Sequence, residues 1–127
     1  MSSLEELKLF SNNFGGTIPS DIGNLTNLKT LEIYNNNFSG EIPNSIGQLS
    51  KLEHLILSSN QLIGKLPSSI SNLKSLKVLS LFDNNLLGTI PSSIGELSQL
   101  EELVLSNNAF YGNLPGELAQ LSNLKTL

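Results

Sequence analysis

The stretch NNFSGEIP (residues 36–43) combines turn-forming Asn, Gly and Pro residues with apolar side chains, and it returns as NNLLGTIP at residues 84–91. Equivalent positions recur every 24 residues along the chain, without insertion or deletion. The spacing is kept by five glycines from Gly16 onward, by all five prolines from Pro19 onward, and by Asn12, Asn36, Asn60, Asn84 and Asn108. A fixed period of this length is typical of a solenoid, in which each repeat forms one coil.

The segment KTLEIYN (residues 29–35) precedes one of these asparagines and alternates between apolar and polar residues. Leu31 and Ile33 share one face, which predicts a half-buried β-strand. The chain must then turn at Asn36 and carry backbone N–H and C=O groups inward, where they need hydrogen-bond partners. Because an Asn amide both donates and accepts, the five asparagines are predicted to form a structural ladder through the stack.

The second half of each repeat is predicted to turn the chain back toward the next strand. Gly40 permits backbone conformations that other residues resist, and Pro43 fixes φ and ends local strand pairing. In residues 44–52 apolar side chains recur at spacings of three, which predicts a short helical or 3₁₀ turn. One coil buries too few apolar side chains to offset the entropy of ordering it, so the repeats should fold as one array.

Two stretches carry a closer resemblance, LTNLKTLEIYNNNFSGEIPNSIG (residues 25–47) and LSQLEELVLSNNAFYGNLPGELA (residues 97–119). Both are similar to LxxLxxLxLxxNxLxGxIPxxLGxL, the pattern of the plant-type, 24-residue leucine-rich repeat family, and the similarity covers essentially the whole chain. The resemblance implies an α/β solenoid. It would be a right-handed, curved superhelix with a parallel inner β-sheet, convex 3₁₀ or short helical turns, and a second short sheet near the GxIP block.

The same resemblance predicts how the chain is divided. We expect one leucine-rich-repeat domain over residues 1–127, with about five repeats. Their approximate bounds are 4–27, 28–51, 52–75, 76–99 and 100–123, with a partial repeat at 124–127. Phe14 and Phe38 occupy a position that is buried in the family, so both are expected to face the core.

The ends of the chain depart from the family pattern, because full members carry cysteine-bearing caps and this sequence has no cysteine. MSSLEEL (1–7) aligns in phase with LSNLKTL (121–127), so we expect a segment of a longer ectodomain that begins and ends inside a repeat, with a complete small protein as the alternative. Uncapped ends expose apolar surface and unpaired strand edges. They predict end-to-end self-association through the uncapped repeats.

Charge and composition exclude several classes of function. The net charge is −4 and all seven basic residues are Lys, so the basic stripe that nucleic-acid binding needs is missing. No apolar run approaches the ~18 residues of a transmembrane helix, and the acidic N-terminus lacks the apolar region of a signal peptide. We expect no membrane contact from this segment. Without cysteine there is no disulfide framework or thiolate metal site, and no metal or cofactor is expected.

Side chains that do not serve the core should form columns on the inner sheet, where adjacent strands lie ~4.8 Å apart. Solvent-facing strand positions should favour polar residues, yet apolar and aromatic residues gather there beside the only histidine. Because exposed apolar clusters mark binding surfaces, the candidate ligand-binding residues are Phe10, Tyr34, His54, Ile56, Val78, Phe82 and Val104. The alternative is that β-propensity alone selects such residues on strands.

Acidic residues surround this cluster and favour a basic or neutral partner: Glu5, Glu6, Glu32, Glu53, Asp83, Glu101 and Glu102. Peptide-hormone receptors of the family often hold a ligand carboxylate with two arginines, and this chain has no arginine. Catalysis is not expected. A catalytic His54 would need a nucleophile and an orienting group within hydrogen-bond reach. Ser80 and Glu32 supply the residue types, but an open sheet offers no enclosed pocket.

Two triplets, Asn24-Leu25-Thr26 and Asn37-Phe38-Ser39, fit the N-glycosylation sequon, which makes Asn24 and Asn37 glycosylation candidates. Neither belongs to the predicted ladder, so both should lie at the surface.

The leading hypothesis is a non-enzymatic recognition module within an extracellular or cell-surface plant receptor-like protein. Its partner would be a protein or peptide ligand, with a co-receptor as a further partner. A second hypothesis is an inhibitor of a cell-wall-degrading glycosidase, similar to the polygalacturonase-inhibiting proteins. A third is an ice- or polysaccharide-binding surface, which requires uniform columns. The irregular inner columns argue against the third hypothesis.

Overall fold

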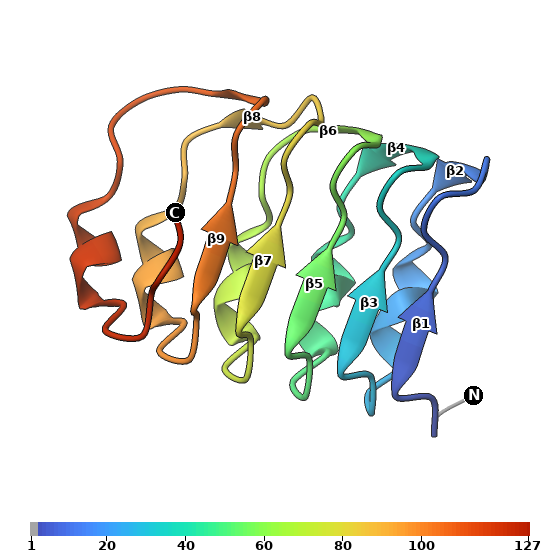
Figure 1. Ribbon diagram of the computed structural model, residues 1–127, viewed down its shortest axis with the longest axis horizontal. Coiled ribbons are helices and arrows are strands. Elements are labelled where there is room, and N and C mark those ends of the chain that lie inside the picture. Colours follow the sequence, from blue (N-terminus) through green and yellow to red (C-terminus); the bar gives the residue numbers. More distant parts are fainter. Residues whose placement is uncertain (1–2) are drawn as a thin grey trace.

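The computed structural model describes residues 3–127, which wind into a stack of coils that share an inner sheet (Figure 1). The five strands of this sheet are parallel and lie in chain order, so neighbouring strands belong to successive coils. They are β1 (Glu6–Lys8), β3 (Thr30–Glu32), β5 (His54–Ile56), β7 (Val78–Ser80) and β9 (Glu102–Val104). Their register joins residues 24 positions apart, as in Leu31 opposite Leu55. The solenoid that the period predicted is confirmed.

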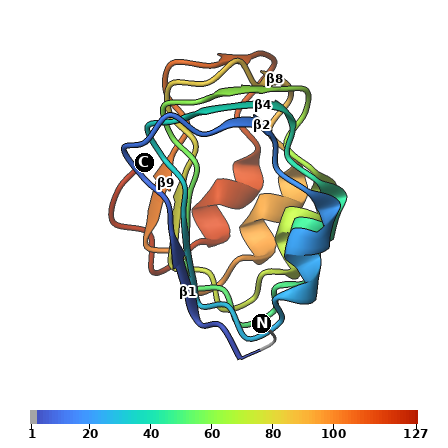
Figure 2. The same ribbon diagram turned by 90° about the vertical axis from the view of Figure 1, so that its right-hand side faces the viewer.

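Each coil returns through a short 3₁₀ helix on the side opposite the inner sheet (Figure 2). Apolar spacing left a helical and a 3₁₀ turn open, and the structure has 3₁₀ in every case. In one coil Pro43, with φ −67°, precedes the helix, and the N–H of Ile46 donates to the Pro43 carbonyl at 3.0 Å. The helices are η1 (Ser20–Asn24), η2 (Asn44–Gln48), η3 (Ser68–Asn72), η4 (Ser92–Glu96) and η5 (Gly116–Gln120).

A glycine inside three of these turns, η1, η2 and η4, permits close packing against the next coil. A Cβ on Gly47 would lie 2.7 Å from the carbonyl oxygen of Ser69 in the next coil, and one on Gly23 would lie 2.8 Å from the carbonyl oxygen of Ser45. Interiors packed at crystal-like density have no room for such overlaps. A side chain at either glycine would therefore push adjacent coils apart.

A second set of short parallel strands follows each inner strand, as the family resemblance implied (Figure 2). Strands β2, β4 and β6 form one sheet, and β8 with β10 forms another. A single bridge from Lys65 to Leu87 connects the two sheets. The strands are β2 (Gly15–Thr17), β4 (Asn37–Glu41), β6 (Gln61–Ile63), β8 (Leu87–Gly88) and β10 (Ala109–Phe110).

Leucine and isoleucine side chains from the inner strands, the second sheets and the 3₁₀ helices fill the interior as one continuous core. The expectation that both phenylalanines face this core is only half right. Phe38 is partly buried and packs against the core, whereas Phe14 is 48% exposed. Phe14 lies in the first coil, so no described coil covers its outer side.

The predicted asparagine ladder connects the coils. The Asn60 amide donates to the carbonyls of Ile33, Leu57 and Ser58 at 3.1–3.2 Å, and its oxygen accepts the Phe38 N–H at 3.0 Å. Each ladder amide thus satisfies backbone groups of its own coil and of the coil before it. Equivalent bonds recur at Asn36, Asn84 and Asn108. Asn12 has only a bond to the Phe10 carbonyl, because no described coil precedes it.

The residue before each ladder asparagine is where the chain leaves the inner strand. Asn35 has φ 58° and Asp83 has φ 59°, and the equivalent residues Ser11, Ser59 and Asn107 are also left-handed. Asn and Asp tolerate this region better than most residues. These five positions form the turn that directs the ladder amide inward. They are not part of the inner strands.

Candidate ligand-binding face

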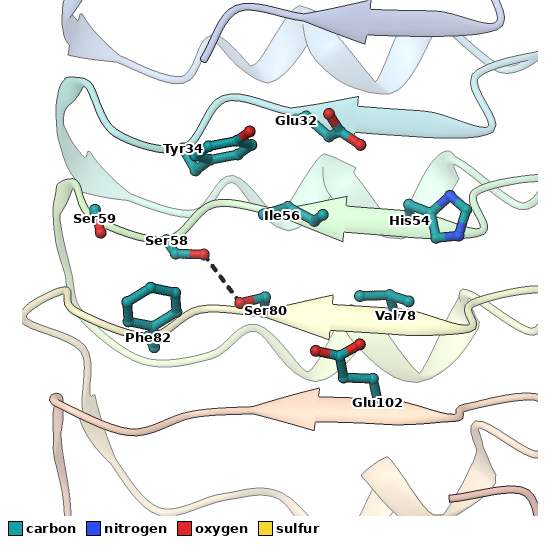
Figure 3. A pocket seen from close by; sticks show the side chains of 10 residues that line it. All are labelled: Glu32, Tyr34, His54, Ile56, Ser58, Ser59, Val78, Ser80, Phe82 and Glu102. Atoms are coloured by element: carbon teal, nitrogen blue, oxygen red, sulfur yellow. Dashed lines mark hydrogen bonds between the residues drawn. The ribbon is translucent and has the colours of Figure 1, made fainter. Parts of the chain in front are cut away.

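The solvent-exposed face of the inner sheet, or inner face, carries a pocket of about 520 Å³ (Figure 3). Its lining comes from four successive strands, so residues about 24 apart in sequence become neighbours. Five of the seven predicted ligand-binding residues lie in it: Tyr34, His54, Ile56, Val78 and Phe82. The other lining residues are Glu32, Ser58, Ser59, Ser80 and Glu102.

The walls and floor of this pocket differ in side-chain size. Tyr34 and Phe82 stand on either side of Ser58, while Ile56 and Val78 form an apolar surface beside them (Figure 3). Ser58 is 2% exposed and its hydroxyl lies 3.0 Å from the hydroxyl of Ser80. Ser58 and Ser80, which hydrogen-bond to each other, therefore form the floor of the pocket between larger aromatic and aliphatic side chains.

The two remaining predicted residues lie beside the pocket. Phe10 stacks on Tyr34, with ring centroids 4.8 Å apart and planes inclined by 4°. Val104 lies opposite Ser80 in the β7–β9 register and is not part of the lining. Ser58 and Ser80 occupy positions on the sheet face that points away from the core, where exposure would be expected. Both are buried, because burial here depends on the height of the neighbouring side chains.

Four of the seven acidic residues that were predicted to surround the cluster form ion pairs with lysines. The equivalent positions Glu5, Lys29, Glu53, Lys77, Glu101 and Lys125 alternate in charge at 24-residue intervals. Three ion pairs result, Lys29–Glu5 at 3.3 Å, Lys77–Glu53 at 3.3 Å and Lys125–Glu101 at 2.9 Å. Glu6 pairs with Lys8 at 2.9 Å. Among residues 3–127, only Glu32, Asp83 and Glu102 of the seven acids form no ion pair.

Two of these ion pairs shift the pKa of one of their side chains. The hydrogen bond from Lys125, and then its positive charge, hold the pKa of the Glu101 carboxyl below its usual value. The hydrogen bond to Glu6, and then its negative charge, raise the pKa of Lys8. Both pairs are exposed, so they fix side-chain positions more than they stabilise the fold.

His54 is not arranged for catalysis with Ser80 and Glu32. In the β5–β7 register His54 lies opposite Val78, and Ser80 lies opposite Ile56. The Ser80 hydroxyl is already paired with Ser58. Within residues 3–127, no group of three or more His, Cys, Asp or Glu side chains is placed to hold a metal ion.

Both glycosylation candidates lie away from the pocket. Asn24 is exposed at the end of η1. Asn37 is exposed in β4, where its amide donates to the Asn13 side chain at 2.7 Å and accepts from Gln61 at 3.4 Å. The protein face that carries the pocket is therefore separate from both sequons.

A second exposed apolar cluster lies on the strands that follow the inner sheet. Its members are Ile63, Leu87 and Tyr111, at equivalent positions of three successive coils, and Tyr111 is 64% exposed. This cluster was not predicted from the sequence. The column that contains it begins with Gly15 and Ser39 and becomes apolar only in later repeats.

A parallel-stranded solenoid with an asparagine ladder between its coils defines a leucine-rich-repeat scaffold. Residues 1–85 match the family described as "Leucine-rich repeat region". Residues 75–97 and 99–121 each match a "Leucine Rich Repeat". The chain belongs to the plant-type leucine-rich repeat family. No curated protein sequence matches it.

Solved structures of plant proteins share the fold. The Arabidopsis thaliana membrane receptor kinase GASSHO1/SCHENGEN3, whose ectodomain was solved with CASPARIAN STRIP INTEGRITY FACTOR 2, is 50% identical over 98% of this chain, with a TM-score of 0.96. The Arabidopsis receptor kinase HAESA, solved with the peptide hormone IDA and the co-receptor SERK1, is 36% identical over 99% of this chain, with a TM-score of 0.95. A plant ice-binding protein is 36% identical over 92% of this chain, with a TM-score of 0.85.

The chain spans only part of these proteins: 15% of the first receptor, 22% of the second and 38% of the ice-binding protein. Within residues 3–127 no helix has the length and apolar character needed to cross a bilayer. Two of these three structures are plant receptor kinases, which supports a recognition role for the repeats.

Proposed function

We propose that this chain is a recognition segment of an extracellular plant receptor-like protein and that it binds a peptide or protein on its inner face. The observation that carries the proposal is the pocket flanked by Tyr34 and Phe82, because buried aromatic anchors dominate interface energies. The pocket lies on paired strands, so its side chains are held in place before a ligand arrives. A co-receptor is a further proposed partner.

The remaining charges favour a neutral or basic ligand. Glu32 and Glu102 line the pocket and form no ion pair within residues 3–127. A cationic ligand group above Ile56 and Val78 would meet these carboxylates from two sides (Figure 3). Such complementarity guides a ligand to the site and selects against acidic peptides.

The inner face fits a peptide better than the alternatives. Ice or polysaccharide binding needs a uniform column, whereas the column through the pocket changes from Tyr34 to Ser58 to Phe82. An inhibitor of a glycosidase would use the same scaffold, and no specific contact here favours that partner.

The test begins with peptides selected against the chain from a random library displayed on phage. The double variant Tyr34→Ala/Phe82→Ala should weaken the selected peptides by at least ~30-fold, since the loss of one aromatic anchor alone costs about 2 kcal/mol. The double variant Ile63→Ala/Leu87→Ala is the matched control, because it removes two exposed apolar side chains away from the pocket. Unchanged affinity in the first variant, or loss only in the second, would contradict the proposal.

We also propose that Asn24 and Asn37 carry N-linked glycans when the chain is secreted. Both side chains are exposed and lie in the first two coils, away from the pocket. Intact mass after expression in a plant secretory pathway should fall by one glycan in each of Asn24→Gln and Asn37→Gln. A wild-type mass equal to the bare polypeptide would refute this.

A further inference from the structure

One column of the inner face is an aromatic stack with a gap. It reads Phe10, Tyr34, Ser58, Phe82 along successive coils, so a serine stands where a ring would continue the stack. We infer that this gap receives the aromatic side chain of a peptide ligand. The inference rests on the proposed function and adds the chemical class of residue that the pocket selects.

The spacing of the strands sets the size of the gap. Phe10 and Tyr34 lie on adjacent coils and stack face to face with centroids 4.8 Å apart, which equals the ~4.8 Å separation of neighbouring strands. Tyr34 and Phe82 are two strands apart, or ~9.6 Å at the same spacing. A ring placed over Ser58 would lie ~4.8 Å from each, within the range in which aromatic pairs attract.

The floor of the gap suits a planar group. Ser58 and Ser80 are buried and pair through their hydroxyls at 3.0 Å, which uses one of their two O–H donors. The other O–H remains able to donate to a ligand atom. Ile56 and Val78 extend the apolar surface beside the gap (Figure 3), so a ring that enters would also cover apolar protein surface.

The rings of Tyr34 and Phe82 border the gap on two sides (Figure 3), which distinguishes it from a general apolar pocket. Aromatic rings gain attraction from offset-stacked and edge-to-face contacts beyond the area they bury. A saturated ring of similar size gains only from the area that it buries. The site should therefore prefer an aromatic side chain over an aliphatic one of equal size.

The experiment uses two probes, N-acetyl-phenylalaninamide and N-acetyl-cyclohexylalaninamide, titrated into the isotope-labelled chain and followed by NMR. The aromatic probe should shift the amides of Tyr34, Ser58 and Phe82. It should bind about tenfold more tightly than the saturated probe, a difference of about 1.4 kcal/mol.

Filling the gap is the decisive variant. Ser58→Phe should weaken the aromatic probe by about tenfold. Ser106→Phe adds the same side chain to the same column beyond Phe82, where it leaves the gap open, and should bind as wild type does. If Ser58→Phe does not fold, Phe82→Leu removes one ring while keeping an apolar wall, and it should abolish the preference for the aromatic probe.

Equal affinity for the two probes, no shift at Tyr34, Ser58 and Phe82, or undiminished binding by Ser58→Phe would each overturn the inference. The proposed function fails separately. If library peptides lose binding in Tyr34→Ala/Phe82→Ala but the probes show no aromatic preference, then the face binds peptides and the gap does not select a ring.

Discussion

Asn84 shows how one side chain stabilises two coils. Its amide nitrogen donates to the carbonyls of Leu57 and Leu81 at 3.1 Å, and its oxygen accepts the Leu62 N–H at 3.1 Å. The side chain is buried, so water cannot replace these bonds. A repeat that turns its backbone inward at this point depends on a residue that both donates and accepts.

Replacing Asn84 tests this role at the residue scale. Asn84→Ala should lower the free energy of unfolding by about 3 kcal/mol, because it leaves buried backbone groups without partners. Asn85→Ala is the matched control, since Asn85 is the adjacent residue, is exposed, and should change stability by less than ~0.5 kcal/mol. Urea unfolding monitored by circular dichroism gives both values. Equal losses in the two variants would show that the ladder is not the cause.

Single residues also mark the limit of prediction from sequence. The asparagine ladder was predictable because a fixed period places identical amides at one level of every coil. The left-handed conformation of Asn35 and Asp83 was not recognised, because serine, which lacks their enrichment in this region, stands at the equivalent position of two other coils. The burial of Ser58 depends on its taller neighbours, and residue type alone does not reveal it.

At the scale of elements, a glycine in η1, η2 and η4 allows the next 3₁₀ helix to approach closely. The sequence repeat contains this glycine, but only the packing explains it, because a Cβ added there would meet the backbone of the next coil. The stacking of the coils also places acidic residues that were expected to surround the inner face in ion pairs with lysines of adjacent coils. The alternation of Glu5, Lys29 and Glu53 at 24-residue spacing already contained that signal.

Gly47→Ala should destabilise the chain by roughly 1–3 kcal/mol, because overpacking between elements has costs of that order. The new Cβ would lie 2.7 Å from the Ser69 carbonyl oxygen. Gly116→Ala is the control, since a Cβ there meets nothing within 4 Å. It should be neutral or slightly stabilising. Thermal unfolding of both variants measures the difference, and a stabilised Gly47→Ala would refute the packing argument.

At the scale of the whole molecule, the stack presents apolar side chains at both ends. Leu127 is 69% exposed, and Phe14 at the other end is also exposed. Large exposed apolar surfaces favour association, and parallel coils offer edges of the same kind at each end. The contact between two such ends would be head-to-tail, which permits open assemblies instead of closed dimers.

We therefore predict that the isolated chain self-associates as its concentration rises. Sedimentation velocity should show an increasing average mass, and Phe14→Lys together with Leu127→Lys should restore the monomer by placing charge on both ends. Tyr34→Lys, which adds a charge on the inner face instead, should not. A wild-type monomer at every concentration would contradict this prediction.

The central claim is that the inner face around Tyr34 and Phe82 is the recognition site. The most direct measurement is NMR mapping of a library-selected peptide on the isotope-labelled chain. Shifted amides should cluster on β3, β5 and β7 around the pocket, with the second sheets unchanged. Shifts confined to the strands that carry Ile63, Leu87 and Tyr111 would contradict the account and move the binding site to that face.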